Sequence, residues 1–401
     1  MPTRSFAIVH YHEIGLKGRN RSVFENILVR NLDRSLEGTG ATKPRKLPGR
    51  VIVALDEGAD LETVAERITR VFGVANFGLG VGGRLDASAL SDVAWDVVRD
   101  RDFATFAVRA RKAHSEFPLS AREINEKVGA SLLERSGKRV NLSEPDLTCY
   151  IEIVGDLVIV YADRRRGPGG LPVGASGKVV ALVSAGIDSP VAATRIMRRG
   201  SRVVFAHFHS QPYTDASSAR QAAEIVELLT RYQLASTMYL LPLAPAQQVI
   251  AARCPEPLRT LLYRRMMMRI ASEVARRESA GALVTGDSLG QVASQTLENL
   301  GVVEDASDIP VLRPLVGRDK EEIVAEARAL GTFEVSSAPC QEACVLFEPK
   351  RPATRSTVEQ LRAAEADLDL DAMTAESVAG AEVRNFRFPV SVPSGRAEGL
   401  L

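Results

Sequence analysis

A regular alternation of apolar and amphipathic segments after residue 177 restricts the fold of this chain more than any other feature. Four short apolar runs, KVVALVS, RVVFAHFH, STMYLLPL and ALVTGD, begin at residues 178, 202, 236 and 282, and a longer amphipathic stretch follows each of them. Apolar runs separated by helices are typical of a parallel sheet that is buried on both faces. Such a sheet normally binds its ligand where strands end and helices begin.

The N-terminal part of the chain predicts two smaller α+β units. Residues 81–166 contain two helices, a strand and a hairpin around Gly155. The stretch GPGGLPVGASG at 167–177 is rich in turn residues, so we predict that it links these units to residues 178–401. Residues 1–80 fit a ferredoxin-like βαββαβ sandwich, with elements expected at 5–11, 21–37, 50–55 and 61–72.

Composition and charge favour a cytoplasmic globular protein with more than one domain. With 45% apolar and 25% charged residues, the 401-residue chain differs from collagens, disulfide knots and disordered chains. Its four cysteines are too scattered for a secreted disulfide framework, and we find neither a signal peptide nor an apolar run long enough for a membrane. The net charge is +1, but residues 1–50 and 101–140 are enriched in Lys and Arg, so a polyanionic partner is compatible with the sequence.

The turn Ser184–Pro190 is the strongest candidate site. It joins an apolar strand to a helix, and its small residues allow successive N–H groups to point at one anion. Ser184 and Ser189 can donate hydrogen bonds to phosphate, and Asp188 can cap the helix or orient a metal-bound phosphate. From the spacing alone, an ordinary strand–helix turn is an equally good interpretation.

Two other strings suggest different chemistry. GLPVGASGKV is similar to a Walker A loop, but Pro172 stands at its first glycine position and Val179 stands where Ser or Thr is needed. GDSL at 286–289 is similar to an esterase motif with Ser288 as the nucleophile. All five histidines precede Ser288, and the expected Asp-x-x-His near the C-terminus is absent, so we expect no hydrolase.

Five ordered motifs together resemble one family. The loop SAGIDSPVAA is similar to the PP-loop of ATP pyrophosphatases. Together with HEIGLKGRNR, HFHSQPYT, YRRMMMRI and TGDSLGQVASQTLENL, it resembles the tRNA 4-thiouridine synthases, or tRNA sulfurtransferases. The resemblance covers about residues 5–355. It implies a multidomain α/β and α+β protein with a ferredoxin-like domain, an RNA-binding THUMP domain at 81–166 and a Rossmann-like PP-loop domain at 178–401.

The resemblance assigns ATP, together with Mg²⁺, to the PP-loop domain. Asp188 is also expected to act in catalysis, while His207 and Phe208 would border the adenosine. Alternatively, Phe208 is an ordinary core residue without contact to the adenosine. We expect Met266–Met268 in the core of a helix and Arg265 in contact with solvent. The implied ATP-binding residues are Leu182, Val183, Ser184, Ala185, Gly186, Asp188, Ser189, His207, Phe208, Arg264, Gly286 and Gln295.

One residue departs from the common loop pattern SGGxDS. Ala185 stands where the family has its first glycine. Alanine fits this position if its φ is negative, because only glycine adopts positive φ without strain.

Cys344 is the predicted catalytic cysteine, because PCQEACVLFEPKRPATR at 339–355 resembles the family segment that bears it. In the implied reaction, ATP converts the C4 oxygen of a uridine into an adenylate, and a persulfide then delivers sulfur to that carbon. Cys344 would carry the persulfide or attack it. Cys340 is one candidate for a resolving thiol, although C-x3-C does not establish a pairing. Without the resemblance, two small buried residues would be the simpler interpretation.

Other family features bear on cofactors and partners. Some archaeal relatives hold an iron–sulfur cluster, and Cys254, Cys340 and Cys344 stand in the corresponding regions, but Cys254 is not part of a C-x-x-C, so we expect no metal there. Cys149 is expected in the core. The residues after Arg355 are too few for the rhodanese domain of some relatives. We therefore expect a separate cysteine desulfurase or other persulfide donor. The sequence does not support the role in thiamine synthesis that some relatives have through the rhodanese domain.

RNA binding is expected in the first two units, where basic residues cluster. Contacts with phosphates position a folded RNA without reading its sequence, and they weaken steeply with salt. The THUMP resemblance implies that the tRNA acceptor end binds there and that uridine 8 leaves its stack to reach the PP-loop pocket. Taken alone, each of these basic residues is equally well interpreted as an ordinary surface residue in contact with solvent. The predicted RNA contacts are Lys17, Arg19, Arg21, Arg109, Arg111, Lys112, Lys138 and Arg139.

The sequence therefore predicts a cytoplasmic, ATP-dependent tRNA sulfurtransferase that forms 4-thiouridine and acts with tRNA, a persulfide donor and a reductant, as a homodimer by resemblance. Another PP-loop enzyme that adenylates RNA or a small molecule is the alternative enzyme, and a requirement for Cys344 separates the two. An RNA-binding adaptor that no longer uses ATP is the alternative from another class. Release of pyrophosphate or AMP with tRNA separates it from an enzyme.

Overall fold

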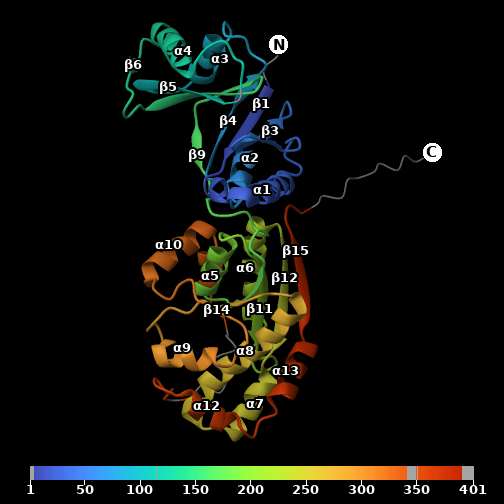
Figure 1. The fold of residues 1–401 in the computed structure, drawn as a ribbon. Helices are drawn as coiled ribbons and strands as arrows, with labels where there is room; N and C mark the ends of the chain where they lie inside the picture. Colours follow the sequence, from blue (N-terminus) through green and yellow to red (C-terminus); the bar gives the residue numbers. More distant parts are fainter. Residues whose placement is uncertain (1–3, 114, 341–348, 350, 391–401) are drawn as a thin grey trace, which may run out of the picture. The chain divides into compact units, whose positions relative to one another are not determined.

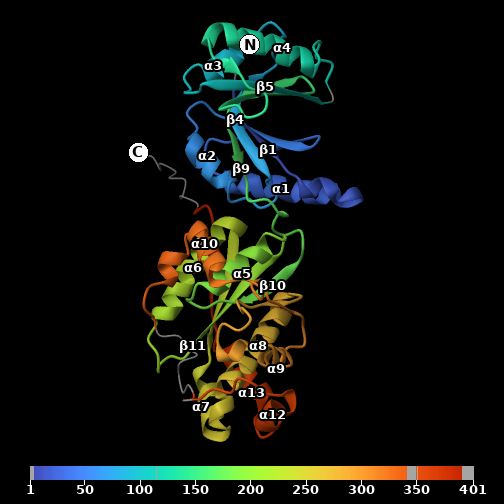
Figure 2. The same cartoon turned by 90° about the vertical axis from the view of Figure 1, so that its left-hand side faces the viewer.

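The protein, seen in a computed structural model, divides into two compact units, residues 1–175 and 176–401 (Figures 1 and 2). The structure describes residues 4–113, 115–340, 349 and 351–390. Each unit is built on a sheet of its own, and the two are described separately.

The first unit is built on a nine-stranded sheet with the order β2-β3-β1-β4-β8-β7-β5-β6, in which β9 also pairs with β4. Its elements are β1 (Arg4–His10), η1 (Glu13–Leu16), η2 (Gly18–Asn20), α1 (Arg21–Ser35), β2 (Arg45–Leu47), β3 (Arg50–Leu55), α2 (Leu61–Ile68), β4 (Asn76–Gly83), α3 (Leu90–Val98), β5 (Thr105–Ala113), α4 (Ala121–Ser136), β6 (Arg139–Val140), β7 (Leu147–Val154), β8 (Leu157–Tyr161) and β9 (Arg164–Arg166).

Strand β4 connects the ferredoxin-like half of this sheet to the half built from residues after Gly83. It pairs with β1 on one side and with β8 and β9 on the other. Alternate residues of β4 are glycines, and a Cβ atom on Gly80 would lie 2.2 Å from the carbonyl oxygen of Val160. The glycines therefore allow β8 to approach closer than any side chain would permit.

The glycine-rich stretch after β9 packs onto the first unit. The N–H of Gly167 donates to the carbonyl of Ala75 at 3.0 Å, and the side-chain amide of Asn31 donates to the carbonyl of Val173 at 3.0 Å. Leu171 and Val173 are both buried. The chain thus leaves the first unit after residue 175.

The second unit is built on a six-stranded sheet with the order β14-β13-β10-β11-β12-β15, parallel except for β15. Its elements are β10 (Lys178–Leu182), α5 (Asp188–Met197), β11 (Arg202–His209), α6 (Ser217–Gln233), β12 (Ala235–Pro242), α7 (Ala244–Arg253), η3 (Glu256–Leu258), α8 (Arg259–Glu278), β13 (Leu283–Val284), η4 (Ala293–Gln295), α9 (Leu297–Glu304), β14 (Val311–Leu312), α10 (Lys320–Leu330), α11 (Phe333–Ser336), α12 (Val358–Glu365), α13 (Leu370–Ala379) and β15 (Glu382–Arg387).

The strand order places a switch point beside β10. The chain runs outward from β10 through β11 to β12 and then returns to place β13 on the opposite side of β10. Connections after β10 and β13 therefore diverge and leave a crevice at the carboxyl ends of these strands. The predicted parallel α/β sheet is confirmed, and it adds an antiparallel edge strand, β15, from a tail that the sequence left unassigned.

The last of the four amphipathic stretches, residues 288–301, is an α-helix only in its final part. Gly290 has φ +78°, residues 293–295 form the short 3-10 helix η4, and the α-helix α9 begins only at Leu297. The side chain of Thr296 accepts a hydrogen bond from the N–H of Asn299, which fixes the start of α9. The irregular segment lies beside the crevice.

Candidate active site

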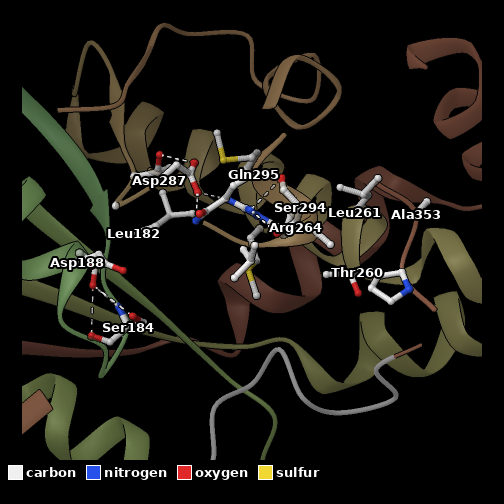
Figure 3. A pocket seen from close by; sticks show the side chains of 18 of the residues that line it. Leu182, Ser184, Asp188, Thr260, Leu261, Arg264, Asp287, Ser294, Gln295 and Ala353 are labelled. Carbon is white, nitrogen blue, oxygen red and sulfur yellow. Dashed lines mark hydrogen bonds and ion pairs between the residues drawn. The ribbon is translucent and has the colours of Figure 1, made fainter. Parts of the chain in front are cut away.

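A pocket of about 410 Å³ opens at the carboxyl ends of β10 and β13 (Figure 3). Its walls come from the segments that follow these two strands, from α8 and from residues 352–353. The lining residues are Leu182, Ser184, Asp188, Ser189, Pro257, Thr260, Leu261, Arg264, Met267, Met268, Thr285, Gly286, Asp287, Val292, Ala293, Ser294, Gln295, Pro352 and Ala353.

Two serines close the loop that follows β10. The N–H of Ser184 donates to Oγ of Ser189 at 2.9 Å, and the N–H of Gly186 donates to Oγ of Ser184 at 3.1 Å. Helix α5 begins directly after this loop, at Asp188. The loop therefore presents the positive end of a helix dipole to the pocket, which suits phosphate.

Ala185 adopts an ordinary backbone conformation. It is buried, and the described non-glycine residues with positive φ are only Leu234 and Ser279. The condition on which alanine fits this position of the loop is therefore met without strain.

The carboxylate of Asp188 is held by two neighbours at the pocket. Lys320, the first residue of α10, lies 2.6 Å from Oδ1, and the side-chain amide of Gln291 donates to Oδ2 at 3.1 Å. Sequence reasoning missed both partners, because they lie more than 100 residues away and follow different strands of the sheet. The ion pair fixes the carboxylate beside Ser184 and Ser189.

Glycine is required at position 286 by the close approach of two loops. A Cβ atom there would lie 2.8 Å from the backbone N and 2.9 Å from Cα of Ser189. The segment after β13 thus packs directly against the start of α5, and this contact forms one side of the pocket.

Asp287 lies next to Gly286 and is buried at the centre of a polar cluster. Its Oδ1 accepts hydrogen bonds from Arg264 and, at 3.2 Å, from Gln295, while its Oδ2 accepts from Oγ1 of Thr285 at 2.7 Å (Figure 3). Burial raises the pKa of Asp287, but the opposing effects of Arg264, Thr285 and Arg313 are larger together, so the pKa lies below its ordinary value. Sequence reasoning placed Asp287 at a helix start in the nucleotide pocket but did not identify Arg264, Gln295 or Thr285 as its partners.

The predicted ATP residues separate into two groups. Leu182, Ser184, Asp188, Ser189, Arg264, Gly286 and Gln295 line the pocket. The other five positions, whose side chains do not line it, are Val183, Ala185, Gly186, His207 and Phe208.

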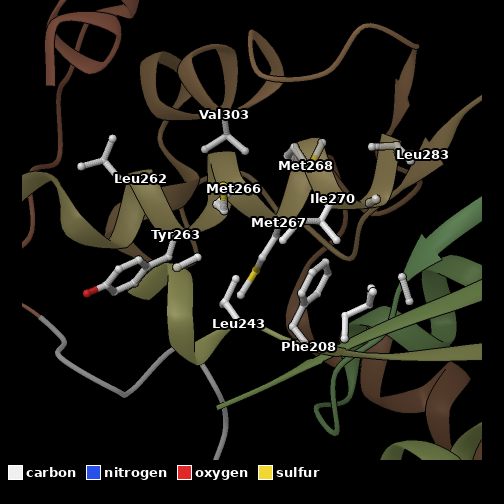
Figure 4. Close-up of a cluster of buried hydrophobic side chains, with 14 of the residues drawn as sticks. Phe208, Leu243, Leu262, Tyr263, Met266, Met267, Met268, Ile270, Leu283 and Val303 are labelled. Atoms are coloured by element: carbon white, nitrogen blue, oxygen red, sulfur yellow. The ribbon is translucent and has the colours of Figure 1, made fainter. Parts of the chain in front are cut away.

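His207 and Phe208, predicted beside the adenosine, lie in the interior. The Nδ1 atom of His207 lies 2.9 Å from the carbonyl oxygen of Val183. Desolvation lowers the pKa of His207 to about 4, against the opposing effect of its bond to Val183. Phe208 packs in the main core beside Met267 and Leu243 (Figure 4).

Helix α8 separates core from pocket. Met266, Met267 and Met268 are buried in the core, as predicted, but Met267 and Met268 also line the pocket, which the sequence did not indicate. The prediction that Arg265 is solvated is wrong, because this residue is 1% exposed. Its guanidinium donates to the carboxylate of Glu365, the last residue of α12, at 2.9 Å.

The cysteines lie in different surroundings. Cys344 lies outside the described residues, and Cys340, just before it, is partly buried. Cys149 is a core residue, as predicted, and burial raises its pKa to about 12. The thiol of Cys254 donates to the carbonyl of Ala364 at 3.3 Å, and burial raises its pKa.

The structure separates the basic residues predicted to bind RNA. On β5, Arg109 and Arg111 are exposed on the face opposite the buried Phe106 and Val108. Lys112 lies on the same face as Phe106 and Val108 and donates to the carbonyl of Phe117. The remaining predicted contacts differ in how strongly they are held.

Arg21 is held by the carboxylate of Glu25 at 2.7 Å and by the hydroxyl of Tyr11 at 2.8 Å. Lys17 lies over the ring of Phe24 and Lys138 lies over that of Phe103. Arg19 and Arg139 are exposed.

Three further observations concern other classes of protein. The hydroxyl of Ser288 donates to the carbonyl of Arg318 at 3.0 Å, a backbone partner and not a histidine. Within the described residues, no three His, Cys, Asp or Glu side chains gather to hold a metal ion. No helix in the described ranges is long and apolar enough to cross a membrane.

Comparison with known proteins gives consistent matches along the chain. A family model described as "ThiI ferredoxin-like domain" matches residues 6–78, "THUMP domain" matches 87–163, and "Thiamine biosynthesis protein (ThiI)" matches 174–370. The chain is 41% identical to a "Probable tRNA sulfurtransferase" of Moorella thermoacetica, over 94% of this chain and 96% of that one. A second, from Thermus thermophilus, is 40% identical, over 94% and 93%.

A solved structure resembles this one throughout. The crystal structure of a 4-thiouridine synthetase–RNA complex with bound ATP is 36% identical in sequence and has a TM-score of 0.89. The match covers 96% of this chain and 100% of that one. By the extent of these matches, the chain belongs to the tRNA sulfurtransferase family.

Proposed function

We propose that this protein is an ATP-dependent tRNA sulfurtransferase that forms 4-thiouridine at uridine 8. The observation that carries the proposal is the pocket at the switch point beside β10, closed by two serines, in a chain similar over nearly its full length to a 4-thiouridine synthetase solved with RNA and ATP. ATP and tRNA would meet in this enzyme at the ends of β10 and β13.

The seven predicted ATP residues that line the pocket divide the work of binding. The loop from Ser184 to Ser189 would receive the phosphates on its N–H groups and hydroxyls, and Arg264 would add a fixed cation. Asp188 is an oxygen ligand of the kind that Mg²⁺ prefers. Bound Mg²⁺ would neutralise phosphate charge, and Asp188 would hold it there. The backbone of Val183, His207 and Phe208 would bound the adenosine.

The chemistry would proceed in two substitutions. The C4 oxygen of uridine attacks the α-phosphorus of ATP, and pyrophosphate leaves. The terminal sulfur of a persulfide on Cys344 then bonds to C4, and AMP leaves with the oxygen. A second thiol, for which Cys340 is the candidate, then attacks Sγ of Cys344 and breaks its bond to the sulfur on C4, which frees the thiolated base. The disulfide left between the two cysteines must be opened by an external reductant. A cysteine desulfurase would supply the persulfide in the cytoplasm.

RNA would bind the first unit through its exposed arginines and lysines. Arg109, Arg111 and Lys112 on β5 and Arg139 on β6 are exposed members of the predicted set, and of these Lys112 donates to the carbonyl of Phe117. Uridine 8 would leave its stack to enter the pocket, as other enzymes that modify a base require. We retain the homodimer as part of the proposal, on resemblance alone.

The decisive experiment is mass analysis of tRNA nucleosides from cells with and without the protein. Cells that lack it should lose 4-thiouridine, the intact chain should restore it, and Cys344→Ser should fail to restore it. Cys149→Ser is the matched control for thiol loss, since Cys149 lies in the core of the other unit. If 4-thiouridine persists without the protein, the proposal is wrong.

A further inference from the structure

Asp287 connects three segments of the pocket wall through one buried carboxylate. Arg264 comes from α8, Gln295 from the short helix η4, and Thr285 from the end of β13. The side chain of Asp287 is 4% exposed, and Nε of Arg313 lies 3.5 Å from Oδ2 as a further cation. Each carboxylate oxygen thus receives at least one donor, as a buried charge requires.

The contacts restrict Arg264 in particular. Its Nη1 donates to Oγ of Ser294 at 2.8 Å, while its Nη2 bonds Asp287. An arginine side chain held by only one of these partners would sample several rotamers, and binding a ligand would then cost the entropy of ordering it. Two partners at fixed positions remove most of this cost before any ligand binds.

The backbone next to Asp287 is itself fixed. Gly286 packs against Ser189 with no room for a Cβ atom, so Asp287 cannot shift without moving the start of α5. A change in the carboxylate would therefore alter the positions of the Arg264 guanidinium and the Gln295 amide, which both bond it and line the pocket.

We infer that Asp287 is a positioning residue that holds the guanidinium of Arg264 and the amide of Gln295 in the orientation in which they face the nucleotide. This inference rests on the proposed function, since it concerns the ATP of that same site. Asp287 would act through these two side chains, because both of its carboxylate oxygens already accept hydrogen bonds from the protein.

The test compares Asp287→Asn with Asp305→Asn in the full-length protein. Asp305 is the matched control, because its carboxylate bonds Arg265 of the same helix at 3.0 Å but lies outside the pocket lining. Pyrophosphate release with tRNA and ATP gives kcat and KM for ATP, and thermal unfolding gives Tm. We expect Asp287→Asn to lower kcat/KM for ATP by about 100-fold, the size of effect typical of a misplaced group. Asp305→Asn should stay within about twofold.

A double variant shows whether the effect runs through Arg264. In an Arg264→Ala background, Asp287→Asn should cost less than about tenfold, because one of its two targets is already gone. Thr285→Val removes one hydrogen bond to the carboxylate, so it should also lower kcat/KM for ATP, and it replaces Asp287→Asn in the test if that variant does not fold. Full activity of a folded Asp287→Asn, or an equal loss in both backgrounds, would overturn the inference alone. A wild-type protein that releases neither pyrophosphate nor AMP would overturn the proposed function together with it.

Discussion

Gly286 shows how a single residue shapes the pocket. An added methyl group would meet the backbone of Ser189 at under 3 Å, and backbone cannot move aside as a flexible side chain would. We predict that Gly286→Ala displaces the loop after β10 and lowers ATP affinity by at least about tenfold, since active sites lose this much from small displacements. Isothermal titration with ATP measures it.

Gly281 provides the control for that substitution. It precedes β13 in the same segment, and a Cβ atom there would meet nothing within 4 Å. Gly281→Ala should leave ATP affinity unchanged. Equal affinities of the two variants would show that the contact between Gly286 and Ser189 does not shape the site.

His207 predicts how stability depends on pH. Its pKa is lowered by burial to about 4 in the folded protein, against about 6.5 when unfolded, so the unfolded chain binds the extra proton between these values. The resulting stability is complete above pH 6.5 and is lost as the pH falls toward 4, by about 3 kcal/mol in all. Urea unfolding at a series of pH values measures this loss.

Replacing His207 by Asn separates this residue from other titrating groups. Asn keeps a donor for the carbonyl of Val183 but has no proton to gain in this range. His207→Asn should therefore flatten the stability curve between pH 6.5 and 4. A variant with the wild-type slope would show that other groups cause the loss.

At the scale of elements, α8 depends on a partner from the tail. Arg265 projects from this helix into the interior, and Glu365 at the end of α12 bonds it there. We predict that Glu365→Ala destabilises the protein by about 3 kcal/mol, because it leaves a buried arginine with fewer partners. The free energy of urea unfolding measures this effect.

The exposed arm of the same cluster gives the contrast. Arg362 bonds Asp305 at 2.6 Å, but its side chain is 65% exposed. Arg362→Ala should cost less than about 1 kcal/mol, because exposed ion pairs contribute little. If both substitutions cost the same, burial is not what gives the bond between Glu365 and Arg265 its strength.

At the scale of the whole molecule, β5 determines which basic residues can meet an RNA. Arg109 and Arg111 are exposed on one face of this strand, whereas Lys112, also exposed, lies on the opposite face and donates to the carbonyl of Phe117. We predict that changing both arginines to Ala weakens tRNA binding and reduces the slope of log K against log salt by up to about 1.8, since each phosphate contact contributes about 0.9. Filter binding at several salt concentrations measures the slope.

Two single variants control that experiment. Lys112→Ala should change the slope less than either arginine, and Arg122→Ala, an 87% exposed residue of α4 bonded to Glu126, should not change it. Identical slopes for all variants would place the RNA elsewhere on the protein.

Periodicity and motif order predicted the fold well because they are local properties. Apolar runs separated by helices define a parallel sheet, and the small residues after β10 identify its loop, so this loop was predicted without coordinates. The segment after β13 was not, because the positive φ of Gly290 interrupts a helix-like pattern and the cap at Thr296 starts α9 only beyond it, and periodicity reveals neither conformation.

The sequence by itself determined which segments form strands and helices and where the loop from Ser184 to Ser189 lies, because each depends on residues close together in the chain. It also determined the family, because each of the five motifs is short and their order along the chain can be read directly. Only the tertiary structure decided that Asp287 bonds Arg264, that Lys320 bonds Asp188 and that Glu365 bonds Arg265. These partners lie 23 to 132 residues apart. Which of many charged side chains meet is decided by the packing of helices on the sheet, and burial then strengthens the pairs of Asp287 and Glu365.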